Sequence, residues 1–152
     1  MKITLQRTSP NYRQKLSTTQ IMNYLTVGLL VIVAWSLVSA MLNQGSDYLI
    51  KALLIYVVSI VAALATEAVW AYIHKSNIVD HMKTSFPLVT SIIFALTLPV
   101  GTPLYVVAIG SFCAIFLGKL VYGGFGQNIF NPALVGRVIV HLSYGAQLTT
   151  TL

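Results

Sequence analysis

Charged side chains are scarce in this sequence, and acidic ones are nearly missing. Only 8% of the 152 residues are charged, with 3 acidic against 9 basic side chains, whereas soluble globular chains are about a quarter charged. Residues 16–46 and 84–118 contain no Asp, Glu, Lys or Arg at all. Each stretch exceeds the roughly 20 apolar residues that a helix needs to cross hydrocarbon. Because a chain this short cannot bury such helices in a soluble core, the sequence predicts an all-α integral membrane protein.

Cysteine is limited to Cys113, which lies inside an apolar run. A single cysteine excludes an intrachain disulfide and a multi-cysteine metal site. His74 and His81 lie in one loop without a cysteine or acidic cluster beside them, so no metal site is predicted. The net charge of +6 does not indicate nucleic acid as a partner, because no basic face studded with aromatic residues follows the basic N-terminal stretch.

Five membrane segments are expected, and one polar arm precedes them. The arm, residues 1–20, carries basic residues and no acidic ones, which predicts that the arm lies in the cytoplasm. The mildly basic loop at residues 74–83 agrees with this orientation, and Asn43 to Asp47 reads as a turn. An odd number of segments then places residues 148–152 outside. The membrane domain covers residues 21–147, with segments at about residues 21–42, 48–73, 86–99, 103–122 and 132–145.

The third segment is shorter than the others. Eleven residues separate Pro87 from Pro99, which makes about 16 Å of helix at 1.5 Å per residue, or about half a bilayer. Short, proline-interrupted segments are typical of the broken helices of transporters. The alternative is a short tilted span that ends in the turn at residues 99–103.

Residues 123–132 form a stretch rich in glycine and asparagine between two membrane segments. Glycines there allow positive φ and the close approach of a ligand or a neighbouring helix. The alternative is a tight interhelical turn. Pro132 is placed to begin the last helix. Lys119, at the end of the preceding segment, is expected to extend to the membrane interface.

Two ionisable residues lie inside membrane segments and are candidates for function. Glu67 belongs to the second segment, and intramembrane carboxylates face the protein interior or a water-filled path. It is therefore the candidate for an ion path, the alternative being a carboxylate paired with a neighbouring helix or protein chain. Arg137 lies near the start of the last helix, where its guanidinium suits a lipid headgroup, a carboxylate or a flavin phosphate. His141 shares its face and is expected to be a packing residue.

Two motifs resemble a known family. Residues 123–136, GGFGQNIFNPALVG, resemble the GG-x-G-x-N-x-x-NPA-x-x-G signature of the RnfD/NqrB family. Residues 88–99, LVTSIIFALTLP, resemble that family's broken helix. Ser9-Pro10 before a basic arm resembles the RnfD branch, while Arg137 after Gly136 resembles NqrB. The resemblance covers essentially the whole chain.

The resemblance implies a fold of about ten membrane helices in two inverted repeats, of which this chain matches the N-terminal one. The chain is thus expected to be a truncated, split or decayed form of the full-length protein. Family members carry FMN esterified to a threonine in an S-G-A-T-like motif. That motif lies downstream of the matched region, and Thr149-Thr150-Thr151 lacks a preceding Ser-x-Ala. No covalent FMN threonine is therefore expected here, although riboflavin is a further cofactor candidate.

The implied function is that of a non-autonomous subunit in the bacterial cytoplasmic (inner) membrane. Its partners would be the other subunits of an Rnf-type complex, which couples flavin-mediated electron transfer between ferredoxin and NAD to sodium or proton transport. The alternatives are an NqrB-like half in a sodium-pumping NADH:quinone oxidoreductase, or a channel half without a redox role. In NqrB the paired glycines are linked to quinone or inhibitor binding. The resemblance therefore places four residues near a quinone or flavin: Gly123, Gly124, Asn128 and Arg137.

Overall fold

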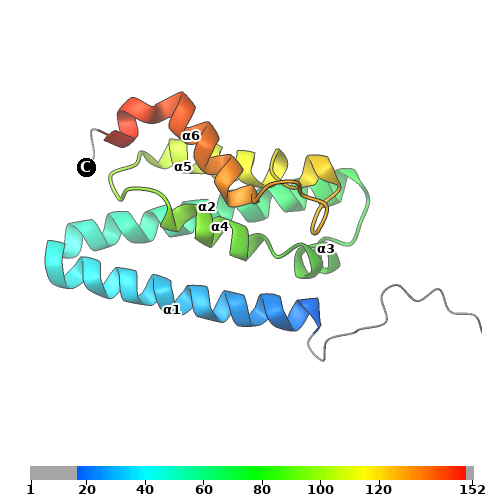
Figure 1. The fold of residues 1–152 in the computed structure, drawn as a ribbon, viewed down its shortest axis with the longest axis horizontal. Helices are drawn as coiled ribbons and strands as arrows, with labels where there is room; N and C mark the ends of the chain where they lie inside the picture. The colour runs from blue at the N-terminus through cyan, green and yellow to red at the C-terminus, as the bar shows by residue number, and fades with distance from the viewer. Residues whose placement is uncertain (1–16, 150–152) are drawn as a thin grey trace, which may run out of the picture.

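The computed structural model describes residues 17–149, and these form helices joined by short turns (Figure 1). The expectations for residues 1–16 and 150–152, which include most of the basic arm, Ser9-Pro10 and most of the threonine run, lie outside the described residues. Within the described part no strand occurs, which confirms the all-α prediction. The elements are α1 (Thr18–Gln44), α2 (Ser46–Ile73), α3 (Ile78–Ser85), α4 (Pro87–Leu96), α5 (Leu104–Phe116), the 3-10 helix η1 (Leu120–Tyr122) and α6 (Pro132–Thr149).

Helices α1 and α2 form a hairpin around a single residue, Gly45. Its φ of 87° lies in the left-handed region that favours glycine. The expected turn at residues 43–47 is therefore tighter than predicted, and Asp47 is not a turn residue but belongs to the first turn of α2. Ser17 caps the start of α1: its hydroxyl accepts from the Gln20 backbone N–H, and the Gln20 side chain accepts from the Ser17 N–H. This reciprocal pair is a capping box.

Helix α4 is buried among the longer helices (Figure 1) and contacts α1, α2, α5 and α6. With ten residues it is about 15 Å long and too short to cross a membrane. One of its backbone carbonyls is bonded to a neighbouring helix, because the Ser59 hydroxyl of α2 donates to the Ser91 carbonyl at 3.0 Å. Ser111 of α5 in turn donates to the Ser59 carbonyl at 2.7 Å. A half-length helix covered by protein is the arrangement that membranes tolerate for interrupted segments.

Helices α5 and α6 approach each other through glycines. A Cβ on Gly136 would lie 2.6 Å from the Gly110 carbonyl oxygen and 2.7 Å from the Ala114 Cβ, so only glycine fits at this position. Small residues at such crossings are typical of membrane helix pairs. The adjoining core contains Phe94 and Val140, both fully buried.

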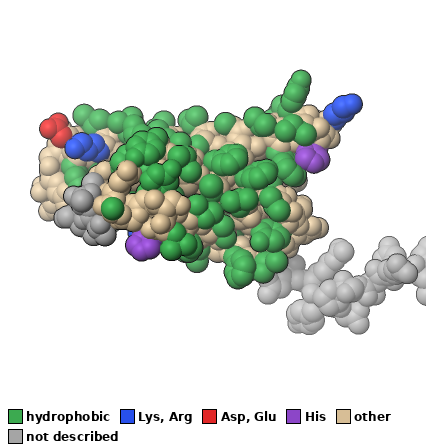
Figure 2. Space-filling model, turned by 90° about the horizontal axis from the view of Figure 1, so that it is seen from above, with side chains coloured by type: hydrophobic (Ala, Val, Ile, Leu, Met, Phe, Trp, Pro, Cys, Tyr) green, Lys and Arg blue, Asp and Glu red, His purple; other side chains and the backbone are tan. Residues whose placement is uncertain are grey.

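The exterior is strongly apolar. Among residues 17–149, three helical stretches are long and apolar enough to cross a membrane, namely Thr18–Gln44, Ser46–Ile73 and Leu104–Tyr122. Only 11% of the most apolar stretch of α1 is buried, and Trp35 is 75% exposed. Figure 2 shows hydrophobic side chains spread over one face, with the acidic and basic side chains visible there lying near its two ends. The protein is therefore an all-α membrane protein, since water would not tolerate such a surface.

Candidate functional site: a buried ion pair beside an amphiphilic cavity

The most unusual feature of the interior is an ion pair between two membrane segments. The Lys119 ammonium, just beyond α5, lies 2.6 Å from Oε1 of Glu67 on α2. Glu67 is fully buried and Lys119 is 2% exposed. The prediction that Lys119 extends to the membrane interface is therefore wrong. The Glu67 carboxylate compensates the charge of the ammonium inside the bundle, so the side chain does not have to extend to the headgroups.

Helix α3 completes the coordination of this pair. The Ser85 hydroxyl donates to Glu67 Oε1 at 2.6 Å, and the Ser85 carbonyl accepts from Lys119 Nζ at 2.5 Å. His81, one turn earlier, places its Nε2 2.7 Å from Glu67 Oε2. Both carboxylate oxygens and two of the three ammonium protons are thus bonded. A buried charge pair needs such hydrogen bonds to offset the free-energy cost of its desolvation.

Local sequence explains why α3 forms and where it ends. The Asn77 side chain accepts from the Val79 backbone N–H and caps the helix start. Phe86 then adopts φ 51°, ψ 52°, and is the single residue between α3 and α4. Pro87 follows and begins α4 at the position where its missing N–H costs nothing. This sharp corner turns His81 and Ser85 toward Glu67. The loop expected at residues 74–83 therefore contains most of a helix.

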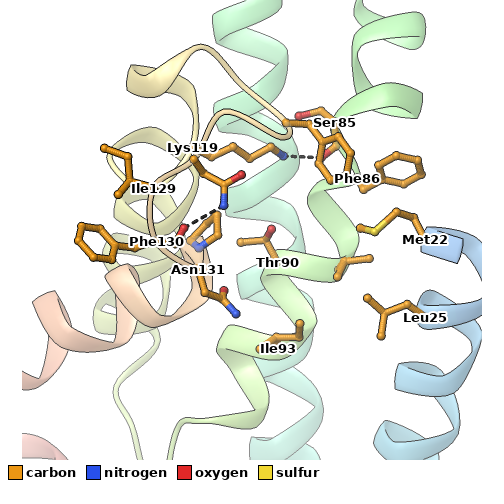
Figure 3. A pocket seen from close by; sticks show the side chains of 14 residues that line it. Met22, Leu25, Ser85, Phe86, Thr90, Ile93, Lys119, Ile129, Phe130 and Asn131 are labelled. Atoms are coloured by element: carbon orange, nitrogen blue, oxygen red, sulfur yellow. Dashed lines mark hydrogen bonds between the residues drawn. The ribbon is translucent and has the colours of Figure 1, made fainter. Parts of the chain in front are cut away.

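A cavity of about 410 Å³ adjoins the ion pair (Figure 3). One side is polar, with Lys119, Ser85, Thr90 and the two asparagines Asn128 and Asn131. The rest of the wall is apolar and comes from α1, α4 and the segment before α6. Cavities of this size and mixed lining are typical of small-molecule sites. The apolar wall consists of Met22, Leu25, Phe86, Val89, Ile93, Phe125, Ile129, Phe130 and Pro132.

The segment at residues 123–131 contributes Phe125 and the run from Asn128 to Asn131 to the cavity wall. Gly123, Gly124 and Gly126 have φ of 108°, 100° and 85°, which confirms that glycine is used here for positive φ. The Asn128 amide donates to the Phe130 carbonyl at 2.9 Å, and Asn131 Oδ1 accepts from the Ala133 N–H at the start of α6. The two asparagines thus hold the segment in shape.

An aromatic contact fixes this segment to the α3–α4 corner. The rings of Phe86 and Phe125 meet edge to face, with centroids 5.2 Å apart. Such pairs contribute about 0.5 to 1.5 kcal/mol beyond burial. The contact joins the two parts of the chain that most depart from regular helix.

The structure separates the candidate residues into three groups. Asn128 lines the cavity. Glu67 does not line it but is hydrogen-bonded to Lys119 and Ser85, which do. Gly123 and Gly124 shape the turn before the cavity but are not among its lining residues. Arg137 also lies away from the lining, and its Nη1 is buried without a hydrogen-bond partner among the described residues.

Sequence reasoning missed the roles of His81, Ser85 and Lys119. Two signals were available. Lys119 is the basic residue that ends a long uncharged run, while Glu67 lies inside another apolar segment, so pairing would neutralise both. His81 and Ser85 are four residues apart, which places them on one face if residues 78–85 are helical. Among residues 17–149, no group of three or more His, Cys, Asp or Glu side chains is placed to hold a metal ion.

Comparison with known proteins identifies relatives along almost the whole chain. The model of the NQR2, RnfD, RnfE family matches residues 5–152. A protein of Psychromonas ingrahamii, named as a D-type subunit of an ion-translocating oxidoreductase complex, is 33% identical over 144 residues, which cover 95% of this chain and 39% of that protein. A protein of the same name from Actinobacillus succinogenes is 33% identical over 82% of this chain and 35% of its own length. The chain therefore spans well under half the length of the curated relatives it matches.

Proposed function

The chain belongs to the NQR2, RnfD, RnfE family, and from this premise we propose that it acts as a membrane subunit of an ion-translocating oxidoreductase complex of the Rnf type. Within that complex, its own task is to hold an electron-carrying ring system in the cavity beside Lys119. The observation that carries the proposal is the joint lining of this cavity by Lys119, whose side chain is buried, two asparagines and an apolar wall.

The lining suits the isoalloxazine ring of a flavin such as riboflavin. Its apolar edge would pack against Phe86 and Ile93, while the amide groups of Asn128 and Asn131 would bond its polar edge. Lys119 has one ammonium proton without a partner in the described part of the chain, and this proton can bond a ring carbonyl or stabilise negative charge on the ring. When bound, the flavin supplies the electron transfer, and the protein contributes position and charge.

The relatives' names mention ion translocation, and we assign the coupled ion as sodium or protons. The membrane is the bacterial inner membrane, with the start of α1 on the cytoplasmic side. One observation, read by a general rule, supports this orientation. The stretch containing Lys75 and Lys83 lies at the same end of the bundle as the start of α1 (Figure 1), and cytoplasmic loops are enriched in basic residues.

Riboflavin binding tests the cavity directly. The full chain, purified in detergent, is titrated into riboflavin while flavin fluorescence is recorded, and we expect saturable quenching. Asn128→Ala removes one hydrogen bond to the ring and should weaken binding about tenfold, since such a bond contributes about 1 kcal/mol or somewhat more. Asn43→Ala is the matched control, because Asn43 lies in the last turn of α1, does not line the cavity and donates to the Ser39 carbonyl.

Two results would count against the proposal. Absence of saturable quenching would refute flavin binding. Tighter binding of a short-chain quinone than of riboflavin would identify the cavity as a quinone site, as in the NADH:quinone oxidoreductases. Membership of a complex is tested separately, by co-expressing the tagged chain with the remaining membrane subunits. Recovery of the tagged chain alone would overturn that part.

A further inference from the structure

The ion pair is linked to the surface by an unbroken series of titratable groups, which an ion pair with a purely structural role does not need. His81 contacts one carboxylate oxygen of Glu67, and Lys119 contacts the other. The His81 side chain is 23% exposed, whereas those of Glu67 and Lys119 are 0% and 2% exposed. Lys119 lies on the cavity wall (Figure 3). The three residues therefore connect solvent at the α3 end of the bundle to the cavity.

We propose that His81, Glu67 and Lys119 form a proton path from the α3 surface to the ligand in the cavity. The inference rests on the proposed function, because it needs a ring that takes up a proton when it is reduced. The distances support it: successive heavy atoms lie 2.7 Å and 2.6 Å apart, within the reach required for proton transfer.

The steps of the path balance in protons and charge. Lys119 donates a proton from Nζ to the reduced ring, whose electrons come from an external reductant. Protonated His81 then transfers its Nε2 proton to Glu67 Oε2. The neutral carboxylic acid then turns about its Cγ–Cδ bond, so that the protonated oxygen faces Lys119 and passes this same proton to the amine. His81 takes up a new proton from solution. One proton reaches the ligand, and the protein regains its initial charge.

Within the described part of the chain, the contacts of Glu67 restrict the path to these groups. Around Glu67, the hydrogen-bonding side chains are His81 and Ser85 from α3 and Lys119 from beyond α5. The Ser85 hydroxyl and carbonyl hold the carboxylate and the ammonium together without carrying charge themselves. The other charged residues of α3, Asp80 and Lys83, do not take part in the ion pairs of Glu67. Glu67 thus has one titratable neighbour toward solvent and one toward the cavity.

His81→Ala is the sharpest perturbation, because His81 is partly exposed and its loss leaves the Glu67–Lys119 pair intact. Riboflavin bound to the full chain is reduced with the radical cation of methyl viologen, whose oxidation releases no proton, in weakly buffered detergent solution, and a pH indicator records proton uptake. Loss of a positioned proton carrier should slow uptake about a hundredfold, while riboflavin affinity stays unchanged. Free imidazole should restore the rate by entering the space that the side chain leaves.

His74→Ala provides the matched control. His74 is exposed and stacks on Trp70, and its Nδ1 lies 3.0 Å from the Trp70 carbonyl oxygen. We expect normal proton uptake in this variant and no effect of imidazole.

The outcomes separate the two proposals. Unchanged uptake in His81→Ala with normal riboflavin affinity would overturn the path and leave the proposed function standing. Slowed uptake that imidazole fails to restore would assign His81 a structural role and also overturn the path. Loss of riboflavin binding in the unmodified chain would remove both.

Discussion

Glu67→Gln is the substitution whose energetic effect follows most directly from the structure. Gln has nearly the shape of Glu, so no cavity is formed; the change removes the negative charge and replaces one acceptor oxygen by an amide NH2 donor. The Lys119 ammonium, 2% exposed, then remains buried without its counter-ion. Removing one partner of a buried pair costs about 3 to 5 kcal/mol. Because the Ser85 carbonyl still accepts one ammonium proton, we expect the lower end of that range, about 3 kcal/mol.

The free energy of unfolding is measured by titrating the detergent-solubilised chain with sodium dodecyl sulfate and recording circular dichroism. The double variant Glu67→Gln, Lys119→Met should recover most of the loss, because replacing a whole buried pair by neutral groups is often neutral or stabilising. Asp47→Asn is the acidic control: Asp47 is exposed in the first turn of α2, where its charge contributes about 0.3 to 1 kcal/mol. A Glu67→Gln variant within about 1 kcal/mol of the parent, or a double variant less stable than the single one, would refute the reasoning.

Two smaller effects test the packing of the helices by the same unfolding assay. Gly136→Ala inserts a methyl group against the Gly110 carbonyl and Ala114 and should cost about 1 to 3 kcal/mol. The control Gly28→Ala, with nothing within 4 Å of its added methyl, should change stability by less than about 1 kcal/mol. Equal losses of stability in the two variants would contradict the close helix contact. Ser17→Ala removes the hydroxyl that accepts from the Gln20 N–H and should cost about 1 kcal/mol, with fraying of the first turn of α1 visible in amide hydrogen exchange; an unchanged exchange rate there would show that the cap is not needed.

The sequence was sufficient to predict the helical membrane class, because absence of charge over long runs is a strong and local signal. It also indicated that α4 is short, since two prolines limit the segment. The start of α6 at Pro132 and the positive φ of Gly123 and Gly124 followed from the conformational limits of proline and glycine. In each case one residue type determines the local backbone.

The composition of the site was harder to predict because it depends on contacts between distant residues. Helix α3 has only eight residues, too few for its amphipathic pattern to distinguish a helix from a loop, and its caps involve Asn77 and the left-handed Phe86. Unless α3 is predicted, the sequence does not indicate that the side chains of His81 and Ser85 point in the same direction. Lys119 was expected at the interface because a lysine at the end of a span usually reaches water. That rule fails when a carboxylate lies within reach in a neighbouring helix.

The pairing of Glu67 with Lys119 follows from a general constraint on membrane segments. Each charge alone would cost several kcal/mol in the bundle, and in the uncharged surroundings of these spans each is the other's nearest opposite charge on a membrane segment. An isolated pair would satisfy this constraint anywhere along the two helices. Here it lies instead where α3, the glycine-rich segment and the cavity meet, with a partly exposed imidazole on its outer side. Such placement brings buried charge to the point where electrons and protons would be exchanged, which is why the pair, rather than the apolar surface, is the feature to perturb first.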